Sequence, residues 1–389
     1  MKLEAIQAAI REVGIDGWLF YDHHHRDPIA GRILGLDEKA HITRRWYYFV
    51  PAAGEPAKLV HRVEQGRLDS LPGAKAGYSS WQELHAGLQA MLAKAHRIAM
   101  QYSPNNDIMY VSMVDAGTVE FLRGLGKEVV SSADLVSQFE AVLTAEQIES
   151  HAVAQRAIDA ILAEGWREMG RRVRSSGPVS EFDMVAWFAE AMRRENLIWE
   201  NGPNVSANAN SSDSHYEPTA EHSSPIREGD FILIDIWGRV DKPGTVFYDI
   251  TWTGIVGRAP TEREQLVFES VRNARDAAIS AVEEAFAAGR PICGFEADDA
   301  ARNVIRSAGF GEYFTHRTGH NIGQELHGAG AHLDNLETHD QRRILPHTCF
   351  SVEPGIYLPE FGVRSEVDML TAPGKAWVTG KIQQELVRI

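Results

Sequence analysis

Cysteine is nearly absent from this sequence of 389 residues, which contains only Cys293 and Cys349. Two distant cysteines outside any Cys-x-x-Cys pattern argue against a disulfide framework or a thiolate zinc site, and they fit a reducing compartment. No apolar run approaches the roughly 20 residues that a membrane-spanning helix needs. The first residues, MKLEAIQAAIREVG, include acids and predict an amphipathic helix rather than a signal peptide. The sequence therefore predicts a cytoplasmic protein.

Positive charge is also in short supply, with 39 lysines and arginines against 54 acids and a net charge of -15. Such a surface repels nucleic acid and anionic membranes, so neither is expected as a partner. The composition, 44% hydrophobic and 24% charged, is that of a soluble globular protein. The length exceeds what one ordinary core serves, which favours two domains.

The order of the predicted elements places a domain boundary near Leu143. Before it, short apolar strands at 17–22, 46–51, 57–62 and 96–102 alternate with helical stretches around 81–94 and 113–125, as in an α/β domain. After it, Thr144 and Gln147 form a capping-box pattern that begins a long helix over about 145–173. We therefore expect domains at 1–143 and 144–389.

The second part repeats one order of elements. Helices over about 145–173 and 180–195, the latter capped by Ser180, precede a strand-rich segment at 199–257. Helices over about 261–288 and 295–308 precede a second strand-rich segment at 313–380. This pattern predicts an α+β domain built from two related helix-helix-strand halves.

Two aspartates lie within apolar runs of the first strand-rich segment. DFILIDIW (230–237) contains Asp235, TVFYDITWTGIV (245–256) contains Asp249, and Asp-Lys-Pro-Gly between them predicts a hairpin turn. If the aspartates face each other, the hairpin is centred on Lys242, with a three-residue loop or a bulge at Gly244. Either aspartate alone reads more simply as a cap, a turn residue or a solvent-facing residue. Because FILIDI leaves little room for a solvated face, a buried carboxylate there needs a cation, and a metal meets that need.

The last segment offers further carboxylates. Glu353 ends an apolar run in FSVEPGIY (350–357), immediately before a Pro-Gly turn. In GVRSEVDML (362–370) the alternation places Arg364, Glu366 and Asp368 on one face of a strand. Arg364 can then hydrogen-bond a ligand carboxylate. The alternative is a solvent-exposed polar face with an ion pair.

Histidines cluster between these regions, at His316, His320 and His327 in HRTGHNIGQELHG (316–328). One such histidine is more often a core or surface residue, but three in twelve positions favour a functional site. Upstream, the polar stretch 201–218 carries His215 beside an aromatic residue. Four carboxylates with one imidazole would select Mn²⁺, Co²⁺, Fe²⁺ or Zn²⁺ over Ca²⁺ or copper. Two such ions can bridge a water and generate a hydroxide that attacks a carbonyl.

The motifs LIDIW, YDITWT, HRTGHNIG, VEPGIY and RSEVDML, in this order, resemble the pita-bread metallopeptidases, which include aminopeptidase P, prolidase and methionine aminopeptidase. The resemblance covers about 145–385. The region before it is similar, mainly in layout, to the creatinase-type N-terminal domain of the prolidase and aminopeptidase P branch, which methionine aminopeptidases lack. The resemblance implies cleavage of the first residue from Xaa-Pro dipeptides or short Xaa-Pro peptides, and a homodimer.

The same resemblance assigns roles to individual residues. It implies a two-metal centre whose ligands are Asp235, Asp249 (as the bridge), His320, Glu353 and Glu366. Glu353 would also orient and deprotonate the bridging water. His215 and His327 would contact substrate or stabilise the tetrahedral intermediate, and His316 would line the pocket.

Three departures from the family pattern leave the substrate open. The hairpin is about three residues longer than usual, Trp252 stands where arginine is common, and Trp237 replaces a small residue. A metal-dependent hydrolase or lyase of the same fold, acting on a small non-peptide substrate, is therefore the alternative. A metal-free amidine hydrolase and a binding module fit less well, because relatives of those kinds lose metal ligands and here all five are present.

Overall fold

The computed structural model describes residues 3–37 and 39–389, and the chain divides into two compact units, Met1–Glu140 and Ala141–Ile389. The expected boundary at Leu143 falls inside the second unit. Met1 and Lys2 of the predicted N-terminal helix lie outside the described residues, and the helix itself spans Leu3–Glu12. No helix among the described residues is long and apolar enough to cross a membrane.

The first unit is an α/β layer structure around a six-stranded sheet of order β4-β3-β2-β1-β5-β6. β2 runs antiparallel to β1 and β3, while the pairs β1–β5, β3–β4 and β5–β6 are parallel. β1, GWLFYD, is buried along its whole length, as expected of a strand covered on both faces. The strands are β1 (Gly17–Asp22), β2 (Trp46–Pro51), β3 (Ala57–His61), β4 (Ala74–Tyr78), β5 (Arg97–Met100) and β6 (Glu128–Ser131). The helices are α1 (Leu3–Glu12), α2 (Pro28–Leu34), α3 (Trp81–Met91), α4 (Ala116–Gly124) and α5 (Ala133–Val136).

The second unit contains the predicted pair of helix-helix-strand halves. Its helices are α6 (Ala145–Ser176), α7 (Glu181–Arg194), α8 (Glu262–Ala287) and α9 (Gly294–Ser307). The strands of the first half are β7 (Val179–Ser180), β8 (Leu197–Ile198), β9 (Asn204–Ala207), β10 (Pro225–Ile226), β11 (Phe231–Val240) and β12 (Tyr248–Ile255). Those of the second half are β13 (Asn321–Ile322), β14 (Cys349–Val352), β15 (Gly355–Leu358), β16 (Phe361–Arg364), β17 (Val367–Ala372), β18 (Lys375–Thr379) and β19 (Val387–Arg388).

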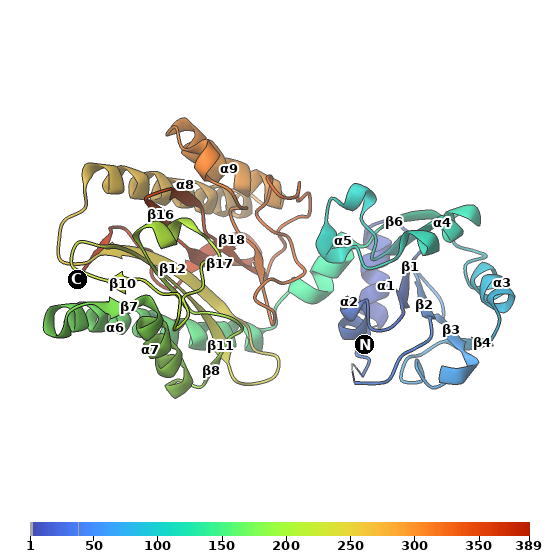
Figure 1. Ribbon diagram of the computed structural model, residues 1–389. Helices are drawn as coiled ribbons and strands as arrows, with labels where there is room; N and C mark the ends of the chain where they lie inside the picture. The colour runs from blue at the N-terminus through green and yellow to red at the C-terminus, as the bar shows by residue number, and fades with distance from the viewer. Residues whose placement is uncertain (1–2, 38) are drawn as a thin grey trace. The chain divides into compact units, whose positions relative to one another are not determined.

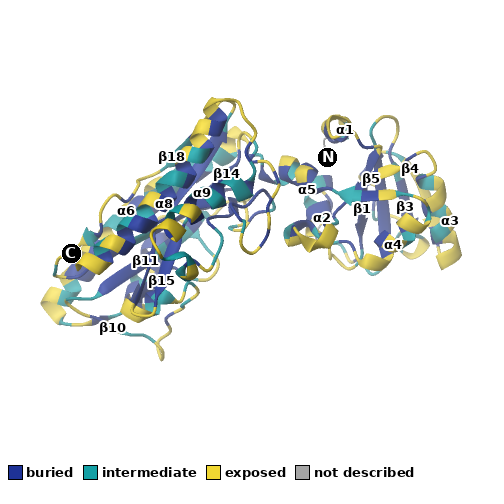
Figure 2. Ribbon diagram, turned by 90° about the horizontal axis from the view of Figure 1, so that it is seen from above, coloured by how far each residue is buried: buried dark blue, intermediate teal, exposed yellow. Residues whose placement is uncertain are grey.

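Two sheets of this unit matter for the site. β11 and β12 form a sheet of order β19-β12-β11-β8, with β9 also on β11, and the second half forms a sheet of order β13-β14-β17-β18. Figure 1 shows α6 and α7 on one side of these strands and α8 on the other. Each helix pair buries its own apolar cluster against the strands. Figure 2 shows exposed and buried residues alternating along α8, whereas the strands are mostly buried.

Helix capping was predictable from the sequence. Thr144 and Gln147 form both hydrogen bonds of a capping box at the start of α6, and Ser180 caps α7. These side chains satisfy backbone N–H groups that the first helical turn leaves unpaired. The capping predictions are confirmed.

The strand predicted over 362–370 is wrong as a single element. The chain leaves β16 after Arg364, which pairs with Gly355 of β15, and enters β17 at Val367, which pairs with Val352 of β14. Ser365 and Glu366 therefore lie at a change of partner strand. An alternating pattern of side chains gives the period of a strand but not the strand's partners.

Candidate metal centre

The two aspartates lie on one face of the β11–β12 hairpin, in a different register from the one expected. Asp235 pairs with Thr251, and Asp249 pairs with Trp237, so the hairpin is centred on Pro243 rather than Lys242. The loop is wider than predicted because β11 ends at Val240 and β12 begins at Tyr248. The aspartates are thus diagonal neighbours, and diagonal neighbours on one face still lie within reach of each other.

Thr251 joins Asp235 to Glu366. Its Oγ1 lies 2.9 Å from Oδ1 of Asp235 and 2.6 Å from Oε2 of Glu366, and it accepts a hydrogen bond of 2.9 Å from Nε of Arg364. The Glu366 N–H donates to the Thr251 carbonyl at 3.1 Å. The change of partner strand at Glu366 therefore brings the second half of the unit onto the hairpin.

His320 meets the acids from the other sheet. Its Nε2 lies 3.7 Å from Oδ2 of Asp249 and 3.4 Å from Oε1 of Glu353. Its Nδ1 lies 3.3 Å from the Asn321 carbonyl, which favours a proton on Nδ1 and leaves the Nε2 lone pair directed at the acids. Ser351 accepts from the His320 N–H at 2.9 Å and donates to Glu353 at 3.1 Å, so it fixes both residues.

The structure therefore brings together all five residues that the sequence analysis selected as metal ligands. Ligand atoms of Asp249, His320 and Glu366 all lie within 4.8 Å of one another, and all three residues are buried. Asp235 and Glu353 are half-buried, so they mark the side of the cluster that is open to solvent.

The electrostatics of the cluster call for cations. Burial, together with repulsion from Asp235, raises the pKa of Asp249 well above its usual value. Burial and the charge of Asp249 do the same to the pKa of Glu366, and burial raises that of Glu353 to about 7. Oδ1 of Asp249 has no hydrogen-bond partner among the described residues. Four acids, one imidazole and an orphaned carboxylate oxygen fit divalent metal ions.

Arg364 supplies one positive charge to the cluster and holds Asp235 in place. The buried guanidinium pairs with Oδ2 of Asp235 through one terminal nitrogen, and its Nε lies 4.0 Å from Oε2 of Glu353. Its other terminal nitrogen donates to the Tyr357 hydroxyl at 3.1 Å. Even with the charge of Arg317 acting on Glu353, the four acids are only partly compensated.

His316 lies next to this arrangement rather than among the ligands. Its Nε2 lies 2.7 Å from the Tyr357 hydroxyl, and its Nδ1 lies 2.6 Å from the Arg317 carbonyl. A ring that donates from Nδ1 and accepts from Tyr357 has both nitrogens engaged. Burial, with Arg364 adding, lowers the pKa of His316 to about 3, which keeps it neutral. The geometry suits His316 to orienting Tyr357 and Arg364.

His327 and His215 lie on the open side. The His327 ring meets the His320 ring edge to face, with centroids 4.3 Å apart. His327 and His215 are both exposed. Partial desolvation, with the nearby His215 adding, lowers the pKa of His327 to about 4. The His327 imidazole can therefore reach a molecule that binds at the cluster.

A buried ion pair that sequence reasoning missed anchors the segment leading to His320. Asp298 and Arg302 of α9 pair at 2.8 Å, and both are almost fully buried. Asp298 accepts from the N–H and Oγ1 of Thr318 at 2.9 and 2.6 Å, while Arg302 donates to the carbonyls of Phe314 and His316. Their i,i+4 spacing was visible in the sequence, but its partner segment was not.

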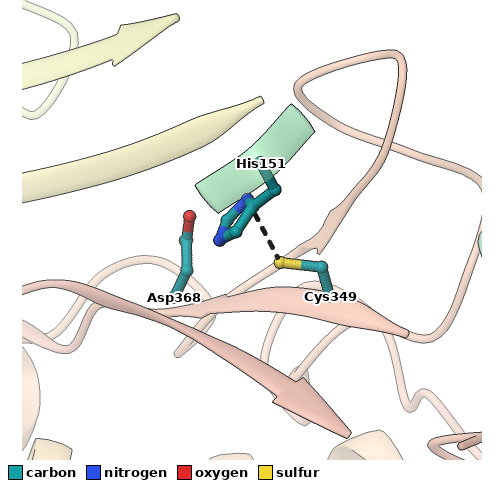
Figure 3. Close-up of side chains that lie close together, drawn as sticks. All are labelled: His151, Cys349 and Asp368. Atoms are coloured by element: carbon teal, nitrogen blue, oxygen red, sulfur yellow. Dashed lines mark hydrogen bonds between the residues drawn. The ribbon is translucent and has the colours of Figure 1, made fainter. Parts of the chain in front are cut away.

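A second buried cluster, His151, Cys349 and Asp368, lies near the first (Figure 3). His151 has both ring nitrogens engaged, with the Phe247 carbonyl at 2.6 Å and the Thr379 hydroxyl at 3.0 Å, and the Cys349 sulfur lies 3.9 Å from Nδ1. Asp368 accepts from the Asp249 N–H at 2.9 Å. With its imidazole already satisfied, this cluster suits positioning Asp249 rather than holding an ion.

The two tryptophans that depart from the family pattern lie on opposite faces of the hairpin. Trp252 pairs with Ile234, the neighbour of Asp235, so its side chain lies on the face opposite to that of Asp235. There it packs against the apolar cluster under α6 and α7. Trp237 is on the face of Asp235, and its indole N–H donates to the Glu200 carbonyl at 3.0 Å. Only Trp237 of this pair therefore borders the candidate centre.

Known proteins resemble this chain in sequence and in fold. The pattern of metallopeptidase family M24 matches residues 146–373, more than half of the chain. The Xaa-Pro dipeptidase of Pyrococcus furiosus is 27% identical over 266 residues, which cover 67% of this chain and 69% of that protein. A probable dipeptidase named PepE from Mycobacterium bovis is 27% identical over 347 residues, covering 87% and 84%.

One solved structure shows how far the fold likeness extends. The dipeptidase PepE from Mycobacterium ulcerans aligns with a TM-score of 0.71 and 22% identity, covering 100% of this chain and 96% of its own. At that identity the alignment shows the fold alone. It extends over both units.

Proposed function

This chain belongs to metallopeptidase family M24, and from that premise we propose that it removes the N-terminal residue from Xaa-Pro dipeptides or short Xaa-Pro peptides. The observation that carries the proposal is the convergence of four acids and His320 on one point between two sheets. Relatives named Xaa-Pro dipeptidase support the substrate class. The N-terminal unit would then be a creatinase-type domain, and the assembly a homodimer.

The five clustered residues would hold two divalent ions, of manganese, cobalt, zinc or iron. When bound, such ions polarise a scissile carbonyl and make water a competent nucleophile near neutral pH. The ligands that would hold them are Asp235, Asp249, His320, Glu353 and Glu366.

The chain's own residues then take distinct roles. Glu353 lies on the open side, so its carboxylate would accept a proton from the attacking water and deliver it to the leaving nitrogen. His215 and His327 would donate hydrogen bonds to the substrate or to the oxygen that gains negative charge. Arg364, held by Tyr357 and His316, would keep Asp235 oriented.

A compact non-peptide substrate is the second candidate, and Trp237 favours it. Trp237 pairs with Asp249 on the ligand-bearing face, and an indole at this position would leave less room for a substrate than a small residue. The same metal-dependent hydrolysis, or a lyase reaction, would then act on a small molecule.

A substrate panel tests the proposal. The protein, loaded in turn with Mn²⁺, Co²⁺, Zn²⁺ or Fe²⁺, is assayed for release of the first residue from Xaa-Pro, Xaa-Pro-Yaa and matched Xaa-Ala peptides. We expect turnover only where proline is second. His320→Ala should lose activity, whereas His339→Ala, at an exposed histidine, should keep it. No turnover by metal-loaded, folded protein on any peptide would overturn the peptidase proposal in favour of the non-peptide one.

A further inference from the structure

The first unit contains a cavity of about 470 Å³ that the proposed peptidase function does not use. It lies where β1, β3 and β4 end, at Asp22, His61 and Tyr78. These three strands point the same way, because β2 is antiparallel to both of its neighbours and β4 is parallel to β3. In open α/β sheets, ligands bind in crevices at the carboxyl ends of such strands. The volume is also in the range of small-molecule sites.

The residues that line this cavity, called here the arginine cavity, are mainly basic, aromatic or hydroxyl-bearing. They are Tyr21, His23, Arg26, Thr43, Arg44, Arg45, His61, Tyr78, Ser79, Ser80, Trp81 and Asp115.

Positive charge outweighs negative charge in the lining of the arginine cavity. Arg26, Arg44 and Arg45 form no salt bridge with any residue that the structure describes. Asp115 is the one acid of the lining, so the lining carries three arginines against one carboxylate; the oxygens of that carboxylate accept from the N–H and hydroxyl of Thr118, each at 2.9 Å. On a chain of net charge -15, a concave group of three arginines is a local reversal of sign.

Two further acids, Glu64 and Glu83, lie beside the arginine cavity. Glu64 lies close to Arg44 and offsets part of its charge, while its carboxylate also accepts from the Thr43 N–H and hydroxyl, at 2.8 and 2.7 Å, and from the Arg44 N–H. Glu83 is paired with Arg62 at 2.9 Å and caps α3. Burial lowers the pKa of His23, and the charges of His24, Arg26 and Arg45 lower it further, as expected beside positive groups.

The wall of the cavity offers flat apolar surface beside these charges. Trp81 is 63% exposed, although tryptophan side chains are normally well buried. Tyr78 is fixed by a hydrogen bond of 2.7 Å from its hydroxyl to the Arg45 carbonyl, and the His61 ring meets it edge to face at 5.0 Å. Arginine guanidinium groups bind oxyanions through paired N–H donors, and an exposed indole stacks on planar rings.

We propose that the arginine cavity is a binding site for a small planar anion, a ring that carries a phosphate or carboxylate group. The arginines hold the oxyanion and Trp81 packs against the ring. All the residues that line the site belong to the first unit.

Calorimetric titration of the full-length, metal-loaded protein tests this assignment. The probes are phenyl phosphate, benzoate, inorganic phosphate and phenol, which separate the oxyanion from the ring and phosphate from carboxylate. We expect phenyl phosphate or benzoate to bind more tightly than either inorganic phosphate or phenol, and binding to weaken with added NaCl.

Variants locate the binding. The double variant Arg44→Gln, Arg45→Gln should lower the affinity for phenyl phosphate or benzoate by at least about tenfold, because each substitution removes a charge-assisted hydrogen bond. Trp81→Ala should weaken phenyl phosphate but leave inorganic phosphate unchanged. Arg97→Gln is the matched control, since Arg97 is an exposed arginine at the start of β5 and pairs with Glu128.

The possible outcomes are decisive. If the double arginine variant binds the probes as tightly as the original protein, the probes bind elsewhere, for example at the metal centre, and the proposal is overturned. So does an absence of heat with every probe at millimolar concentration. Phenyl phosphate that binds no better than inorganic phosphate overturns the assignment of a planar ligand.

Discussion

Replacing Asp249 by asparagine should stabilise the metal-free protein while it abolishes metal binding. The substitution keeps the size of the side chain and removes one charge from a group whose ligand atoms lie within 4.8 Å of one another. Two unit charges at that distance repel by about 3.5 kcal/mol if the effective dielectric constant is ~20. The raised pKa of Asp249 means that part of this repulsion is avoided by protonation, so we expect a gain of about 1–3 kcal/mol.

The sign of the pH dependence follows from the direction of the shift. A carboxyl group whose pKa is raised by folding stabilises the folded state at low pH and loses that contribution as the pH rises through the folded pKa. The advantage of Asp249→Asn over the original protein should therefore be larger at pH 8 than at pH 5. Repulsion from Glu366, whose pKa is also raised by burial and by Asp249, grows in the same direction.

Urea unfolding with a chelator, and again with Mn²⁺, measures both effects. Mn²⁺ should raise the free energy of unfolding of the original protein and leave that of Asp249→Asn unchanged. Asp241→Asn, at an exposed turn residue of the same hairpin, is the control and should alter neither value. The reasoning is refuted if metal-free Asp249→Asn is less stable than the original protein, or if Mn²⁺ stabilises both equally.

Two further predictions concern packing and a buried acid. Gly319→Ala should destabilise the fold by more than about 3 kcal/mol, because the added Cβ would lie 2.0 Å from the Ser351 carbonyl oxygen. Gly323→Ala is the control and should be tolerated, because a Cβ there has nothing within 4 Å. Equal thermal unfolding of the two variants would contradict this prediction. Burial raises the pKa of Asp27 to about 7, so the original protein should lose roughly 2.5 kcal/mol more stability between pH 5 and pH 8 than Asp27→Asn does. In that variant the amide oxygen still caps α2 by accepting from the Ala30 N–H. Urea unfolding of both proteins at both pH values tests this, and an equal response of the two would disprove it.

Local signals predicted the helices and the family well. Capping boxes and apolar spacing located α6 and α7, because these depend on residues three or four positions apart. The family resemblance selected His320 among three histidines, and the match to family M24 confirms that resemblance. The placement of His320 against Asp249 and Glu353 agrees with the ligand set, whose role as a metal site stays a prediction.

Features that depend on pairing between distant segments were harder to predict. The hairpin register was misplaced because the turn residues 241–244 do not reveal that the connection extends to residue 247. Thr251 was overlooked, although its position two residues after Asp249 places it on the same face of β12. The engagement of both His316 nitrogens depends on Tyr357, which no local pattern brings near it.

The split of the cluster between two sheets also has a consequence for how the protein is made. Asp235 and the arginine that neutralises it are 129 positions apart in the chain. During synthesis, the β11–β12 hairpin is therefore complete long before Arg364 and Glu366 exist. Until then its two carboxylates have no positive partner from the second half. Burying the face that carries them would therefore cost desolvation free energy that no ion pair offsets. We expect this face of the nascent first half to stay hydrated, and its final packing to form only after the β16–β17 segment has been synthesised.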